Sequence, residues 1–484
     1  MRVLMISANR NSLPEPVMPA GACMVAEAAR DAGHEVKFLD FMFLKWEKAL
    51  GRTRSLLRGW RPDVTGISAR NIDGNNLGGP VFFARELPPL VRAIREQGHT
   101  LIVLGGAAVS VMPEELLRAS GADCAVLSGG TRVFPKLLER VSRGAGARET
   151  AGTAWLSEGD FKKNAGAADE TEELEDKKIP VPDYAHWLDT RRYTAHFAAA
   201  GLQTKLGCRF DCIYCTYKKI EGGGYRLHSA EAAAHAVERL WAAGFRDVEF
   251  VDNVFNCPCE HAMGICEALV HLKERGVRPG YHTIELNPLF VTDELVSLME
   301  RAGFAGAGIT AESASDAVLH GLQKGFCAEH VYRAAGIVGR HRLPCFWIFL
   351  LGGPGETRNT VEETLRFAAQ RIRPSDPVFF NTGLRIYPGT ELERTARREG
   401  LLSLPAEGML EPVFYVSPEV DPCWIMARVG REMGKNHLNF IDQGSLGFRF
   451  LPLIHRMFSL AGTRPPLWRF TRTIRRVLRP FGIR

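Results

Sequence analysis

The chain has 484 residues, of which 45% are hydrophobic and 24% are charged, so it can form more than one packed core. No apolar run approaches the roughly 18 residues of a membrane-spanning helix. The opening MRVLMISANR predicts a strand and not a signal peptide, and we therefore expect a cytoplasmic protein. The net charge of +6 is local, because residues 445–484 hold nine arginines and no lysine, aspartate or glutamate.

Residues 1–142 alternate apolar runs with helical patterns. Helical patterns cover 20–33 and 81–98, and the apolar runs lie at 2–7, 35–39, 64–68, 101–105 and 124–127. This alternation predicts an α/β domain with a doubly wound, flavodoxin-like parallel sheet. Ligands of such sheets bind beyond the carboxyl ends of the strands, where this sequence places small and polar residues.

A change of composition marks the end of this first domain. Residues 144–152 are small and polar, 168–178 form a charge run, and 179–184 contain two prolines. We expect a linker over residues 143–197.

A second strand–helix series begins at about residue 198. Its helical patterns include 229–244 and 359–372, and its apolar runs lie at 201–206, 247–252, 281–286, 306–312, 345–351 and 378–386. Six such units predict a partial (β/α)6 TIM-type barrel over 198–400, with its active site at the carboxyl ends of the strands. Residues 401–484 are less regular and form a C-terminal region with the basic tail.

Three of the eleven cysteines follow the first strand of this series in the segment GCRFDCIYCTYKK. Cys208, Cys212 and Cys215 have the spacing CxxxCxxC, which lets three thiolates hold three irons of a [4Fe–4S] cluster and leaves the fourth iron open. The alternatives are three unrelated thiols or a zinc site. Zinc prefers four ligands in pairs, and the nearest candidates, Cys257 and Cys259, lack the usual spacing.

The motif CRFDCIYC, with aromatic Tyr214 before the third cysteine, resembles the radical SAM superfamily. The resemblance implies that the open iron binds S-adenosylmethionine (SAM), and that an external flavodoxin- or ferredoxin-type donor supplies an electron that cleaves it to a 5′-deoxyadenosyl radical. Asp252 and Asn253 stand where many members have a Gly-Gly-Glu turn. The SAM-binding residues that it implies are Tyr214, Asp252, Asn253, Glu312, Ser313, Gly352 and Gly353.

The first domain, through the segments 18–36, 63–73 and 104–131, resembles the B12-binding branch of that superfamily. The alternative is a nucleotide-binding flavodoxin-like domain, although GxGxxG is absent. No DxHxxG loop is present, and His34 and His99 precede strands, so we expect cobalt to lack a histidine ligand and Arg70 to approach its lower face or to form a structural salt bridge. The cobalamin-binding residues that the resemblance implies are Ser68, Arg70, Asn71, Gly105, Gly106, Ser128, Gly129 and Gly130.

Together the two resemblances imply a cobalamin-dependent radical SAM methyltransferase. It would move a methyl group from SAM through methylcobalamin to an unactivated carbon of a small-molecule substrate. The alternatives are a cyclase or rearrangement enzyme, like ring-forming relatives of tetrapyrrole synthesis, and a non-catalytic metal-binding interaction protein.

The basic tail mixes arginine with leucine, isoleucine, phenylalanine and tryptophan. We expect a terminal helix packed on the barrel with a solvated basic face. Contact with an anionic membrane surface is the second interpretation, and nucleic acid is disfavoured.

Overall fold

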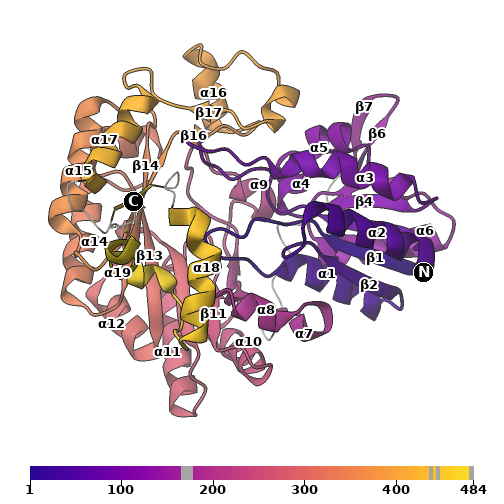
Figure 1. Ribbon diagram of the computed structural model, residues 1–484, viewed down its shortest axis with the longest axis horizontal. Coiled ribbons are helices and arrows are strands. Elements are labelled where there is room, and N and C mark those ends of the chain that lie inside the picture. The colour runs from indigo at the N-terminus through magenta and orange to yellow at the C-terminus, as the bar shows by residue number, and fades with distance from the viewer. Residues whose placement is uncertain (165–177, 435–439, 443–446, 479–484) are drawn as a thin grey trace.

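The computed structural model describes residues 1–164, 178–434, 440–442 and 447–478. Two α/β units lie beside each other (Figure 1), the N-terminal one in indigo and purple and the second in magenta to orange. The charge run at 168–178 lies almost wholly outside the described residues.

The first unit is a seven-stranded sheet in the order β2-β1-β3-β4-β5-β6-β7. Its first five strands are parallel, in the flavodoxin-like order 2-1-3-4-5, and this confirms the expected fold. The strands are β1 Arg2–Ser7, β2 Glu35–Asp40, β3 Val64–Ser68, β4 Leu101–Gly105, β5 Cys124–Val126, β6 Thr153–Ser157 and β7 Asp160–Lys163. The helices are α1 Ala20–Asp31, α2 Trp46–Trp60, α3 Leu87–Arg95, α4 Ala107–Val111, α5 Pro113–Ser120 and α6 Gly130–Ser142.

Part of the expected linker over residues 143–197 forms regular secondary structure. Its first part forms the hairpin β6–β7, which pairs antiparallel with β5 and extends the first sheet. The turn passes through Glu158 and Gly159, both with positive φ, as a tight hairpin requires. Further along, α7 Tyr184–Trp187 and α8 Thr190–Thr194 lead into the second unit.

The second unit is a seven-stranded parallel sheet in the order β8-β11-β12-β13-β14-β15-β18. The terminal strands β8 and β18 do not pair with each other, which confirms the partial barrel. The strands are β8 Ala200–Leu202, β11 Asp247–Phe250, β12 Gly280–Leu286, β13 Phe304–Glu312, β14 Cys345–Leu351, β15 Val378–Thr382 and β18 Phe440–Asp442. Strand β18 falls in the region expected to be irregular, because three residues are too few to show a periodicity.

Helices cover the outer face of this sheet (Figure 1). Several begin at side-chain caps: Ser229, Thr292 and Thr357 each accept a hydrogen bond from the backbone N–H three residues on. The helices are α10 Ala230–Ala242, α11 Cys259–Glu274, α12 Asp293–Ala302, α13 Asp316–Gly321, α14 Ala328–Arg340 and α15 Arg358–Arg371. Two small ladders complete the barrel mouth, β9 Lys205–Leu206 with β10 Arg226–Leu227 and β16 Leu384–Arg385 with β17 Phe414–Tyr415.

The two units share a core. Ile213, Val318 and Leu322 of the second unit belong to the same buried apolar cluster as Ile6 and Val109 of the first. A buried ion pair also joins the units, in which Arg385 Nε donates to Asp73 Oδ2 at 2.7 Å. These contacts fix the two units relative to each other.

The C-terminal segment returns to the barrel. After α16 Glu391–Arg398 come α17 Pro422–Gly434, α18 Gly447–Leu460, the 3-10 turn Leu467–Phe470 and α19 Thr471–Leu478. Trp468 packs against Phe346 with ring centroids 5.0 Å apart and the rings tilted by 59°, and a Cβ on Gly306 would lie only 2.5 Å from the Trp468 ring. Arg469 and Arg472 are exposed, as expected for a tail packed on the barrel with a solvated basic face. Among the described residues, no helix is both long and apolar enough to cross a membrane.

Candidate active site

The three cysteines lie on one loop between β9 and α9 (Tyr217–Glu221). All three are free thiols, and Cys208 is buried while Cys212 and Cys215 are half-buried. The loop is closed by backbone bonds, from Cys208 N to Gly222 O at 3.3 Å and from Cys215 N to Cys212 O at 3.1 Å. Gly207 has φ +86°, and a Cβ there would collide with Gly224 O, so the loop requires glycine at its entry.

Burial favours the protonated form of Cys208 and Cys215 when no metal is present. It raises the pKa of Cys208 and raises that of Cys215 to about 12, and the neighbouring thiols add to both shifts. A bound cation reverses this preference, because metals bind the thiolate form. Among the described residues no three metal-binding side chains converge on one ion. In a cubane cluster each cysteine would bind a different iron.

A buried ionic network lies behind the cysteine loop. Lys324 Nζ donates to Glu312 Oε1 and to the Tyr214 hydroxyl, both at 3.0 Å, and that hydroxyl lies 2.7 Å from Glu312 Oε1. Burial lowers the pKa of Lys324, but the Glu312 and Tyr214 charges outweigh it and raise the pKa above its ordinary value. Glu312 ends β13 with φ +62°, and its second oxygen, Oε2, has no partner among the described residues. This oxygen is therefore available to a ligand.

Asp252 and Asn253, which follow β11 closely, have different roles. The Asp252 carboxylate is fully buried and accepts from Thr204 N at 2.7 Å, Thr204 Oγ1 at 2.6 Å and Lys205 N at 3.1 Å. These bonds connect β11 to the start of the cysteine segment and engage both carboxylate oxygens of Asp252. Asn253 Nδ2 donates to Glu221 Oε2 at 2.6 Å, while its Oδ1 is buried without a partner. Of this pair only Asn253 keeps a free acceptor.

Ser313 and the glycines after β14 shape the same end of the barrel. Ser313 is fully buried, with its hydroxyl 3.2 Å from that of Thr364, so it serves the fold. Gly352 has φ +94° and donates its N–H to Glu356 Oε2 at 3.0 Å. A Cβ on Gly353 would lie 2.9 Å from the Leu322 side chain. These glycines let the chain turn tightly beside the network.

The carboxyl edge of the first sheet faces a cavity of about 2130 Å³ between the two units. All eight predicted cobalamin-binding residues line it. Gly106, at φ +98°, requires glycine because a Cβ would lie 2.5 Å from Ala69 O, whereas a Cβ on Gly105 would enter open space. These features suit a large flat ligand that lies against the backbone.

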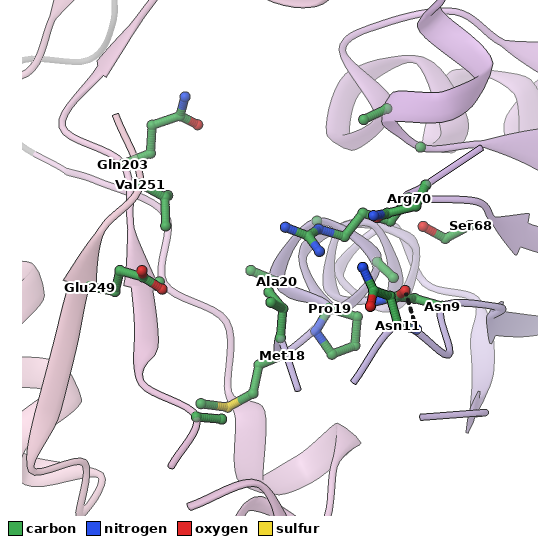
Figure 2. Close-up of a pocket in the computed structure, with 18 of the residues that line it drawn as sticks. Asn9, Asn11, Met18, Pro19, Ala20, Ser68, Arg70, Gln203, Glu249 and Val251 are labelled. Atoms are coloured by element: carbon green, nitrogen blue, oxygen red, sulfur yellow. Dashed lines mark hydrogen bonds between the residues drawn. The ribbon is translucent and has the colours of Figure 1, made fainter. Parts of the chain in front are cut away.

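Arg70 points into this cavity (Figure 2). Its guanidinium forms no ion pair within 4.0 Å of any described residue, so the salt-bridge alternative does not hold in the described part of the chain. Desolvation lowers the pKa of Arg70, and Tyr217 and Glu249 oppose this shift. His34 and His99 precede β2 and β4 and do not line the cavity, as expected. The donor set on this wall therefore fits cobalamin held without a histidine.

Several polar groups of the site were not found by sequence reasoning. Lys324 lies after α13, and nothing in its local sequence marks it as the partner of Glu312. Glu15, Glu249 and Glu285 line the cavity, and burial is the main cause that raises the pKa of each, to about 8 for Glu15 and Glu285. The alternation of β11 could have placed Glu249 on the inner face.

These features together define an α/β protein with a cysteine-rich loop at the mouth of a partial barrel and a ligand-binding sheet edge opposite. Residues 203–368 match the radical SAM superfamily and residues 6–138 match the B12 binding domain. The chain therefore belongs to the B12-binding branch of the radical SAM family. This assignment confirms the expected cofactors, a [4Fe–4S] cluster, SAM and cobalamin.

Several known proteins are similar to this chain. An uncharacterized methyltransferase of Pyrococcus horikoshii is 26% identical over 79% of each chain. A tryptophan 2-C-methyltransferase of Streptomyces laurentii is 22% identical over 78% of this chain and 72% of its own. A radical SAM methyltransferase from Kitasatospora setae, solved with cobalamin and a [4Fe–4S] cluster, is 19% identical, covers 99% of this chain and 98% of its own, and has a TM-score of 0.82. This last similarity supports the fold over nearly the full length.

Proposed function

We propose that the protein is a cobalamin-dependent radical SAM methyltransferase that methylates a carbon of a small-molecule substrate. The observation that carries the proposal is the common cavity. The predicted cobalamin edge forms one wall, and α9, which directly follows Cys215, contributes Tyr217 to the other. When bound, the cluster and SAM supply a carbon radical, and cobalamin carries the methyl group.

The chain's own residues position these groups. Cys208, Cys212 and Cys215 would hold the cluster, and Glu312 and Asn253, each of which has an oxygen without a partner among the described residues, would bind SAM. Arg70 and the glycines of the first sheet would hold cobalamin, with Arg70 excluding water from the lower face of the cobalt. The apolar core that the two units share fixes the two walls of the cavity relative to each other.

The similar proteins favour methyl transfer over cyclisation, since those named above are methyltransferases. The test is anaerobic reconstitution with iron, sulfide and cobalamin, followed by SAM and reductant. We expect both S-adenosylhomocysteine and 5′-deoxyadenosine. Formation of 5′-deoxyadenosine alone would favour a cyclase or rearrangement enzyme and contradict the proposal.

We also propose that an external flavodoxin- or ferredoxin-type protein supplies the electron.

We further propose that the C-terminal tail meets an anionic membrane surface in the cytoplasm. Exposed Met457 and Leu460 lie beside the exposed arginines of the tail, a pattern that suits an interfacial segment. Vesicles rich in phosphatidylglycerol should pellet the full chain but not a chain lacking residues 445–484. Equal pelleting of both chains would remove the membrane contact.

A further inference from the structure

The barrel wall of the cavity carries carboxylates that the cofactors do not explain. Along β11, Val248 and Phe250 are fully buried on the helix side of the sheet, so Glu249 faces the barrel interior. Asp247 lies two residues earlier on the same face of β11, and its Oδ1 is 3.3 Å from His282 Nε2. Glu249 has no hydrogen bond or ion pair with any described residue.

Glu249 and Arg70 project into the cavity from opposite walls (Figure 2). They are more than 4.0 Å apart, since no ion pair joins them. Arg70 lies on the wall predicted to hold the lower face of cobalamin. Glu249 therefore lies on the side from which a substrate would approach the opposite face.

A second carboxylate approaches Glu249 from the other domain. Glu15, on the loop after β1, also lines the cavity without a hydrogen bond or ion pair among the described residues. Burial raises its pKa to about 8, and the Glu249 and Asp247 charges add to the shift. Two carboxyl groups that repel each other in a poorly solvated cavity are unfavourable when both are ionised. A cation between them would remove this cost.

Part of the cavity wall beside Glu249 is apolar. Val251 and Ile284 expose 44% and 42% of their surface, although both line the cavity. Ile348 and Phe346 continue this surface, and Trp468 borders it with its ring tilted by 59° against that of Phe346. A ligand in this half of the cavity would bury an apolar body and place one polar group at Glu249.

We propose that Glu249 binds a protonated nitrogen of the substrate, so that the methyl acceptor is an organic amine with an apolar body. The inference rests on the proposed function, because it assigns the substrate class of that same site. Glu15 supports the contact from the first domain, and Trp468 limits the length of the apolar part.

The test uses the holoenzyme with trideuteromethyl SAM and a small-molecule extract of the source cells. The extract is first divided into fractions that are retained by a cation exchanger, retained by an anion exchanger, or retained by neither. We expect labelled product in the cation-exchange fraction. Label confined to the other two fractions would overturn the assignment.

Two variants separate recognition from folding. With the labelled fraction as substrate, Glu249→Gln should raise KM by about tenfold or more, as expected when a charge-assisted hydrogen bond is lost. Glu267→Gln, at an exposed site on α11, should leave KM unchanged. Both variants should keep the cobalamin content and SAM affinity of the natural chain. An unchanged KM in Glu249→Gln, or a loss of SAM or cobalamin binding, would overturn the proposal.

Failure of the proposed function has a different signature. In that case no fraction acquires label and no S-adenosylhomocysteine forms, whatever residue stands at position 249. Formation of S-adenosylhomocysteine together with label in an anionic product would leave the methyltransferase intact and remove only the amine assignment.

Discussion

The two walls of the cavity hold their polar groups in opposite ways. At the barrel mouth, Asp252 is saturated by hydrogen bonds, and Glu312 is held by Lys324 and Tyr214. At the edge of the first sheet, six of the eight predicted cobalamin-binding residues are glycine or serine, and the guanidinium of Arg70 has no ion-pair partner among the described residues. The first wall therefore holds its polar side chains by hydrogen bonds, and the predicted cobalamin edge of the second has few large side chains.

This difference matches two kinds of ligand. A small, charged molecule that must be oriented for radical chemistry requires side chains already locked in place. A large, flat cofactor gains contact area from backbone that no side chain covers, and needs only one charged group beneath it. The first wall should therefore be sensitive to changes of charge, and the second to changes of volume.

The largest expected effect is on the cysteine loop. Replacing Cys208, Cys212 and Cys215 by alanine removes every thiolate of the loop, so cluster iron and SAM cleavage should both disappear. Cobalamin binding should persist because the edge of the first sheet is untouched. Iron and cobalt analysis of the same preparation measures both. Loss of cobalt together with iron would show that the walls are not independent.

The buried network gives the next effect. Lys324→Met leaves the Glu312 carboxylate buried and unpaired, which should cost about 3–5 kcal/mol of unfolding free energy. The matched control is Arg340→Met, which breaks the exposed pair with Asp293 and should cost less than about 1 kcal/mol. Urea denaturation followed by tryptophan fluorescence compares them. Equal losses would contradict the view that the network is pre-organised.

A smaller effect is expected at Arg70. Arg70→Ala should retain cobalamin but let water reach the lower face of the cobalt, which changes the absorption and electron paramagnetic resonance spectra of the bound cofactor. SAM binding should not change. Arg58→Ala, at an exposed position on α2, serves as the control and should leave the spectra as they are. Identical spectra for both variants would remove Arg70 from the cobalt face.

The smallest effect concerns pH. Burial raises the pKa of Glu356 from 4.5 to about 7, so the folded state favours its protonated form. The stability that this form contributes is fully present below pH 4.5 and is lost as pH rises through about 7. The natural chain should therefore lose about 1–2 kcal/mol relative to Glu356→Gln between pH 5 and pH 8. A difference in unfolding free energy between the two chains that stays constant from pH 5 to pH 8 would contradict the raised pKa of Glu356.

Sequence patterns predicted the strands well, because buried parallel strands form continuous apolar runs. The five parallel strands of the first sheet and all six predicted barrel strands are present. The hairpin β6–β7 was missed although Ser157-Glu158-Gly159-Asp160 is a turn signal, because the surrounding composition resembled a linker. Strand β18 was missed because it is short.

The site was predictable only where its chemistry is local. The three cysteines lie within eight residues, and their spacing alone predicts an iron–sulfur cluster. The position of Asp252 at a strand end was visible in the sequence, but its hydrogen bonds to Thr204 and Lys205 were not. The pairing of Lys324 with Glu312 and the approach of Glu15 to Glu249 depend on how separate elements pack, which no local pattern records.

The most direct test of the account follows the methyl group of SAM to the cobalt. The holoenzyme is incubated anaerobically with trideuteromethyl SAM and reductant, without substrate, and the bound cobalamin is extracted in the dark for mass spectrometry. The account predicts cobalamin that carries the trideuteromethyl group, with S-adenosylhomocysteine as the co-product. Fully loaded protein whose cobalamin remains unlabelled would contradict it.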